Sequence, residues 1–317
     1  MRRLVLLVFV SVLFALGCGS SSKEGVTLKG PADVGQSIDG DPLALLPGSP
    51  VVLAQGDAKT FFSSGVVGAQ VTQMVEKLIP IGDEAGFKAS RDVEKVYAGV
   101  YALQGADVAA VLVGHFDEEK IKKAADAHVQ LKGGGSLVAS QYAGRTVYTV
   151  SNVGFSLLSS KTALVGTETG IRRALDRIRD GRVKRDAPPW MIQTLETPGA
   201  TAAAAADFSS QQLPAQLLQQ LPLPWLKDMK AARVLASFKE NGTQIAGSIT
   251  YGDATQAGTA AGQLRQAQSL TALLSLIGLR IQNMDIQTDQ SDVKFSALVD
   301  DQSLRVLVAN LPRWLGM

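Results

Sequence analysis

The chain has 317 residues, of which 31 are Lys or Arg and 29 are Asp or Glu, giving a formal charge of +2. Without the first 17 residues, which include Arg2 and Arg3, the basic and acidic residues balance. This balance excludes the strongly basic surface of a nucleic-acid-binding protein. A single cysteine excludes an internal disulfide, and the length is sufficient for two domains.

The first 18 residues have the pattern of a secretory leader. Arg2 and Arg3 precede an almost wholly apolar run over residues 4–16, and the small residue Gly17 lies directly before Cys18. This order of positive charge, apolar run and small residue is typical of a cleaved signal peptide. A thiol at the cleavage boundary can take a lipid, and its freed amine can take a further acyl chain.

The segment Ala15-Leu16-Gly17-Cys18 resembles the lipobox of bacterial lipoproteins. The resemblance implies a signal peptide over residues 1–17 and acyl chains, such as palmitate, on Cys18. Because Gly19 rather than Asp follows the cysteine, it also implies the outer membrane. The alternatives are an ordinary secretory leader with an incidental cysteine, or an uncleaved anchor. The apolar run is shorter than the about 20 residues that a membrane-spanning helix needs.

Residues 18–48 are rich in Gly, Ser, Pro and Asp with little periodicity, and we expect a flexible tether there. Order is expected to begin near Pro50, with a strand over 51–54 and a helix over 68–78. Residues 93–103 and 108–116 predict a hairpin, after which Asp117 caps a helix. Strands over 145–150, 154–159 and 162–166 and a helix over 170–179 complete residues 49–186.

The same order of elements recurs over residues 187–317. It comprises a strand over 201–207, a helix over 213–221, a hairpin around Asn241-Gly242, a helix capped by Asp253, and strands over 281–288, 293–298 and 304–308. The sequence therefore predicts an α+β fold of two duplicated units, residues 49–186 and 187–317. Each unit is expected to be an antiparallel sheet with helices on one face.

Three short runs resemble a family of uncharacterised secreted or anchored bacterial proteins. They are Ala85-Gly86-Phe87, the stretch Arg91-Asp92-Val93-Glu94-Lys95-Val96, and Phe116-Asp117 after the expected hairpin. The resemblance covers residues 50–180. The family assigns no catalytic residues, so it implies none here.

Motifs that carry chemistry are missing from the sequence. It contains no Gly-x-Ser-x-Gly elbow and no phosphate-binding Gly-x-x-x-x-Gly-Lys loop. His115 and His128 fall where packing at the edge of the core explains them. Asp285, Asp289 and Asp292 lack the EF-hand pattern, so a polar strand and turn is favoured over calcium. We therefore expect no catalysis, no cofactor and no metal site.

One stretch crowds basic residues and is a candidate for partner binding. Arg172 and Arg173 begin this stretch, which contains seven basic residues in all. Three nearby aspartates reduce its net charge to +4. Beside a membrane, this charge would attract anionic lipid phosphates. The favoured alternative is an amphipathic helix with a solvated charged face. The basic residues are Arg172, Arg173, Arg177, Arg179, Arg182, Lys184 and Arg185.

The three tryptophans are the second interaction candidate. Trp190, Trp225 and Trp314 each follow a proline closely, as in Leu223-Pro224-Trp225-Leu226. Exposed tryptophans on rigid turns would anchor a partner. Packing at the seam between the two units is favoured instead, because large aromatic side chains usually serve the core.

These observations predict a lipid-anchored envelope protein that binds or scaffolds, with an envelope protein as possible partner. A groove at the seam between the units is the expected ligand site, and sheet edges offer docking by strand addition. One alternative is a hydrolase in which Asp57 and Asp207 converge to within about 5–10 Å. Another is a carrier of apolar ligands, which requires a cavity of at least about 300 Å³.

Overall fold

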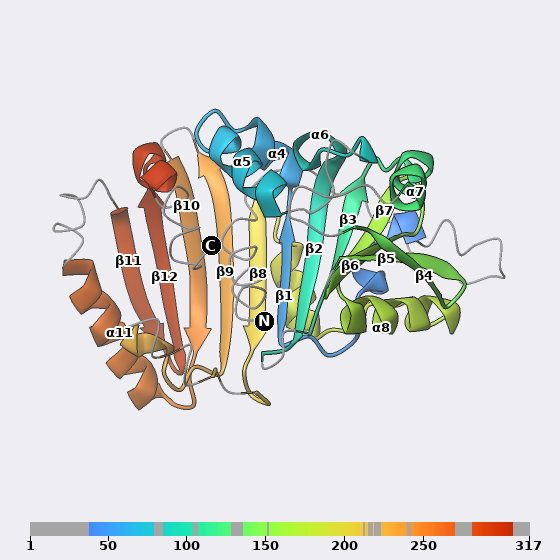
Figure 1. Ribbon diagram of the computed structural model, residues 1–317. Coiled ribbons are helices and arrows are strands. Elements are labelled where there is room, and N and C mark those ends of the chain that lie inside the picture. The colour runs from blue at the N-terminus through green and yellow to red at the C-terminus, as the bar shows by residue number, and fades with distance from the viewer. Residues whose placement is uncertain are drawn as a thin grey trace.

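The computed structural model describes residues 38–78, 85–103, 107–127, 136–150, 152–211, 213–214, 218, 223–239, 242–269 and 281–306. Its centre is one 12-stranded antiparallel sheet with the strand order β11-β12-β10-β9-β8-β1-β2-β3-β7-β6-β5-β4 (Figure 1). The mixed α+β class and the antiparallel pairing predicted from the sequence are confirmed.

Alternating and turn-bounded segments of the sequence form the strands. They are β1 (Val52–Gly56), β2 (Val93–Ala102), β3 (Asp107–Gly114), β4 (Val138–Tyr142), β5 (Arg145–Val150), β6 (Val153–Leu157), β7 (Thr162–Thr167), β8 (Ala202–Asp207), β9 (Ala231–Lys239), β10 (Gly242–Thr250), β11 (Ile281–Asp289) and β12 (Asp292–Val299).

The helices begin at capping residues that the sequence supplies. They are α3 (Pro42–Leu45), α4 (Ala58–Ser63), α5 (Gly68–Leu78), α6 (Ala89–Asp92), α7 (Glu118–Asp126), α8 (Glu168–Arg179), α9 (Pro189–Leu195), the 3-10 turn η2 (Pro224–Leu226) and α11 (Ala254–Ser269). Asp117 and Asp253 accept hydrogen bonds from the backbone N–H groups of Lys120 and Gln256, as the capping pattern predicts.

The expected strand over 304–308 is wrong in its described part, because residues 301–306 are helical. The side chain of Asp300 accepts a hydrogen bond from the backbone N–H of Ser303, at 2.7 Å. That contact caps the start of a helix, and an alternating apolar pattern of only a few residues cannot outweigh it. The helix expected over 213–221 falls mostly outside the described residues.

The two expected units do not form separate sheets. β1 and β8 pair antiparallel, from Val52 opposite Ala206 to Gly56 opposite Ala202, and join both sets of strands into one sheet. The five alanines at the start of β8 are all buried, so this central strand is covered on both faces. The sequence of a strand buried on both faces is a continuous apolar run instead of an alternation of apolar and polar residues.

Helices therefore cover both faces of the sheet, whereas the sequence predicts one. Leu53, Val111 and Leu164 pack beneath α3, α8 and α9 in one core cluster. The neighbouring strand positions point to the other face, where α4, α5, α6, α7 and α11 pack in separate clusters. Because apolar residues occur at consecutive strand positions, one layer of helices could not bury them all.

Each half contributes strands in a comparable order. From the central pair outward, one half runs β1-β2-β3-β7-β6 and the other β8-β9-β10-β12-β11. The hairpin β4–β5 extends the first half only, beyond β6. Duplication of the two halves stays a prediction, with this strand order in its favour.

The expected tether over residues 18–48 is too long at its C-terminal end. Ile38 and Leu45 are at most 2% exposed and belong to the same core cluster as Leu53, and Leu43 and Leu46 pack there as well. The carboxylate of Asp39 accepts hydrogen bonds from hydroxyl groups at the β6–β7 turn. The apolar residues of this proline-containing segment are few and closely spaced, so no periodicity reveals them. The folded body therefore includes residues 38–48.

Candidate functional site

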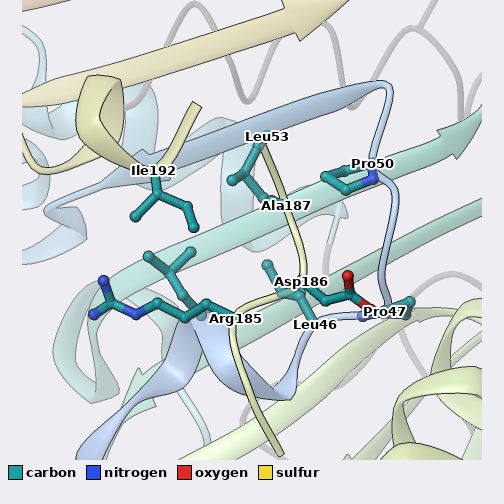
Figure 2. Close-up of a pocket in the computed structure, with 9 residues that line it drawn as sticks. Leu46, Pro47, Pro50, Leu53, Arg185, Asp186, Ala187 and Ile192 are labelled. Carbon is teal, nitrogen blue, oxygen red and sulfur yellow. The ribbon is translucent and has the colours of Figure 1, made fainter. Parts of the chain in front are cut away.

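The seam between the halves contains a pocket where three segments meet β1 (Figure 2). Residues 43–50, the connection at 185–187, Ile192 of α9 and Leu53 of β1 line it. The lining is mostly aliphatic. Its volume is about 10 Å³, which is space for one water molecule at most. This pocket therefore has no room for an acyl chain.

Ion pairs connect the segments around this pocket. Arg185 binds Asp41 at 2.8 Å and Glu196 at 2.6 Å, and so connects the N-terminal segment to the end of α9. Partial burial lowers the pKa of Arg185, but these two acceptors outweigh it and leave the pKa raised. Burial, with Asp41 nearby, raises the pKa of the neighbouring Tyr97 phenol. The arrangement holds these elements together.

The basic stretch of α8 is neutralised in the fold. Arg172 pairs with Glu168 and lies over the Tyr142 ring at 4.7 Å. Arg173 pairs with Asp107 at 2.5 Å and lies over the Tyr101 ring at 4.8 Å.

The remaining guanidinium groups of this stretch have acidic partners too. Arg177 pairs with Asp186, and Arg179 pairs with Asp176 and Asp180. Arg182 pairs with Asp180, and Arg185 pairs with Asp41 and Glu196. Four of the partners, Asp41, Asp107, Glu168 and Glu196, lie outside the stretch counted from the sequence and cancel its net charge of +4. The interpretation of this stretch as a solvated helix face with paired charges is therefore favoured over binding to an anionic lipid surface.

Both described tryptophans pack against the body. Trp190 of α9 packs at the edge of the core cluster under β1 and β8, and Arg233 of β9 lies 4.9 Å from its ring. Trp225 of η2 packs beside α11, and its carbonyl accepts a hydrogen bond from the Tyr251 hydroxyl at 2.5 Å. Trp190 thus lies at the seam and Trp225 at a sheet end. Trp314 and Cys18 lie outside the described residues.

The carboxylates nominated for hydrolysis do not converge. Asp57 follows the end of β1 and Asp207 ends β8, and these two strands run antiparallel. The backbone N–H of Asp57 binds Thr201 and that of Asp207 binds Val51, at opposite ends of the strand pair. Six residues of strand separate them, about 20 Å. Asp57 instead caps α4 by accepting from the backbone N–H of Thr60.

The remaining polar candidates are also apart from one another. The histidine side chain of His115 is 74% exposed, 3.8 Å from Glu94, so the expected packing at the core edge is wrong for it. It extends past the end of β3. His128 lies outside the described residues. Asp285, Asp289 and Asp292 bind Gln287, Lys294 and Thr250 separately. Within the described ranges, no three His, Cys, Asp or Glu side chains are grouped to hold a metal.

The sheet edge at β4 is a surface that sequence reasoning missed. β4 is the last strand of the sheet, and its residues 138–141 are exposed. Val138 is 59% exposed, the only large hydrophobic side chain so exposed among the described residues. The available signal was the uncharged run Val-Ala-Ser-Gln-Tyr before Ala143-Gly144. It is too short for periodicity to assign a strand.

No family model matches the chain, and no curated protein matches it. Solved structures of TP0453 share its fold. Crystal form III has a TM-score of 0.53 and 12% identity over 85% of this chain and 98% of that one. Crystal form I gives 0.51 and 13% over 86% and 97%, and form IV gives 0.51 and 11% over 85% and 96%. At such identity the likeness shows the fold alone.

Proposed function

We propose that the protein is a lipid-anchored envelope protein whose folded body is a non-catalytic binding or scaffolding module. The observation that supports a lipid anchor is the leader ending at Gly17-Cys18, which resembles a lipobox. Several acyl chains on one residue anchor a protein firmly, at about 0.8 kcal/mol for each buried CH₂. The outer membrane is the proposed location because Gly19 follows the cysteine.

The length of chain between Cys18 and the first described residue suits this role. That residue, Ile38, is 2% exposed, and 19 residues separate it from the proposed anchor. Such a length of chain spans at most about 65 Å when fully extended. Among the described residues, no helix is long and apolar enough to cross a membrane.

A scaffolding role is supported by the shape of the body. A sheet of 12 strands ends in two edge strands, β4 and β11, and an edge strand presents unpaired backbone groups to a partner. The hydrolase alternative lacks support from Asp57 and Asp207, which lie at opposite strand ends. The carrier alternative lacks support from the seam pocket, which is too small.

Fractionation of a Gram-negative host that produces the full-length protein tests the anchor. The wild-type protein is expected in the outer-membrane fraction and in the detergent phase on extraction. The Cys18→Ser variant is expected to lose both properties, since no thiol remains to be acylated. Ser64→Ala, in the folded body, is the matched control and should fractionate as the wild type does. Recovery of wild-type protein in the soluble periplasmic fraction would contradict the proposal.

A further inference from the structure

We infer that β4 is a self-association strand, through which two copies of this chain join their sheets edge to edge. The inference deepens the proposed scaffolding role and rests on it. β4 ends the sheet, and no strand among the described residues pairs with its outer edge. Four of its five residues are exposed. α8 packs on β3, β6 and β7, and it meets β4 at Tyr142, the one residue of the strand that is not exposed.

The turn after β4 determines which backbone groups point outward. Ala143 and Gly144 have φ of 49° and 75°, the signature of a two-residue type I′ hairpin turn between Tyr142 and Arg145. Residues that flank such a turn exchange both backbone hydrogen bonds, and pairs alternate along the ladder. Ser140, opposite Val147, therefore bonds toward β5. Ala139 and Gln141 direct their N–H and C=O groups away from the sheet.

An antiparallel copy of β4 satisfies these outward groups when the two-fold axis passes beside Ser140. Ala139 of each copy then exchanges backbone hydrogen bonds with Gln141 of the other. Ser140 faces Ser140 of the second copy as a non-hydrogen-bonded pair, in which the Cα atoms lie about 4.5 Å apart. A pairing of this kind is isologous and closes at a dimer.

The side chains of β4 are self-complementary in that register. Val138 lies opposite Tyr142 of the second copy, and β-branched and aromatic residues are favourable cross-strand partners. The Tyr142 ring is already held in place, since Arg172 lies 4.7 Å from its centroid and its hydroxyl donates to Asp176 at 3.0 Å. Residues 138–142 include no charged residue, so no like charges oppose one another.

The opposite edge of the sheet is protected against such pairing. β11 has a register shift between Gln282 and Asp285, with Asn283 at a φ of 49°. It also carries Asp285 and Asp289. Bulges and charges are the features with which proteins block edge pairing, and β4 has neither. The contrast indicates that only one edge is open to a second copy.

The strength of the contact fits proteins anchored to one membrane. Two five-residue strands bury a few hundred Å², which is less than the roughly 1,200 Å² of a stable specific interface. The dimer is therefore weak in dilute solution. Anchoring confines both copies to a surface and raises their effective concentration, as linkage does. The partner is thus a neighbouring copy on the same membrane.

Disulfide trapping in membranes of cells that produce the full-length protein tests this inference. Ser140→Cys places two thiols across the axis within the 4.4–6.8 Å Cα separation that a disulfide accepts. Mild copper–phenanthroline oxidation, which removes the two thiol protons and two electrons, should convert most of the protein to a covalent dimer. Thr288→Cys, an exposed position on β11, is the matched control and should stay monomeric, as should the wild type.

A second substitution separates edge pairing from chance collision. Val138→Lys in the Ser140→Cys background sets a charge against Tyr142 and should lower the dimer yield at least tenfold. Equal trapping at Ser140 and Thr288, or trapping unaffected by Val138→Lys, would overturn the inference. Fractionation of the same cells keeps the two proposals distinct. A membrane-bound but untrapped Ser140→Cys protein refutes the β4 contact alone, whereas a trapped soluble protein refutes the anchor alone.

Discussion

Leu45→Ala tests whether residues 38–48 belong to the folded body. Leu45 is fully buried in the core cluster that contains Leu53. The substitution removes three carbon groups at about 0.8 kcal/mol each, or about 2.4 kcal/mol of transfer free energy. The cavity left behind brings the expected loss of unfolding free energy to about 3–5 kcal/mol. Val138→Ala, at a 59% exposed position, is the control and should change stability by less than about 0.5 kcal/mol.

Urea denaturation followed by circular dichroism measures this loss. The midpoint should fall in Leu45→Ala with the denaturant slope unchanged, because the surface exposed on unfolding is the same. Thermal unfolding should shift down by at least about 6 °C, from about 2–4 °C per kcal/mol in a chain of this size. A Leu45→Ala protein as stable as Val138→Ala would refute the packing of this segment. Residues 38–48 would then be the flexible tether that composition predicts.

Two further predictions concern close packing and alkaline pH. Gly170→Ala should destabilise the protein by about 1–3 kcal/mol, because the added Cβ would lie 2.1 Å from the Val108 carbonyl oxygen. In the same urea assay, Gly258→Ala in the open face of α11 should instead stabilise it by up to about 1 kcal/mol. Equal effects of the two alanines would contradict the α8–β3 contact. Burial raises the pKa of Tyr251 to about 12, above its ordinary value of 10.0. As the pH rises, the unfolded chain therefore releases the Tyr251 proton before the folded protein does. The contribution of this phenol to the free energy of unfolding is complete below pH 10. On the order of 1–2 kcal/mol of it is lost as the pH rises to 12. Tyr251→Phe should be less stable near neutral pH, lacking the bond to Trp225, yet lose less between pH 10 and 12. An unchanged slope of stability against pH in that window would contradict the burial of this phenol.

Local signals predict much of this fold. Asp117 and Asp253 each precede an apolar helical pattern and supply an N-cap, and both helices begin there. The helix over 68–78 has the bounds that its apolar spacing predicts. Hairpins β2–β3 and β9–β10 follow from alternation on either side of a turn. These elements depend on residues close together in the sequence, so local patterns are enough.

What the sequence does not predict depends on distant contacts. Ile38 and Leu45 are buried only because α8 and β1 meet there, and their composition resembles a linker. Three of the four carboxylates that cancel the charge of the α8 stretch, Asp41, Asp107 and Glu196, are far from their partners in the sequence. The antiparallel pairing of β1 with β8 separates Asp57 from Asp207, although each follows an equivalent strand.

Intact mass with peptide mapping of the membrane-extracted native protein shows whether Cys18 is lipidated. We expect an N-terminal peptide that begins at Cys18 and carries acyl mass, and loss of that species in Cys18→Ser. A mature N-terminus elsewhere, or an unmodified Cys18, would contradict the lipid anchor and leave the β4 contact to be judged by disulfide trapping.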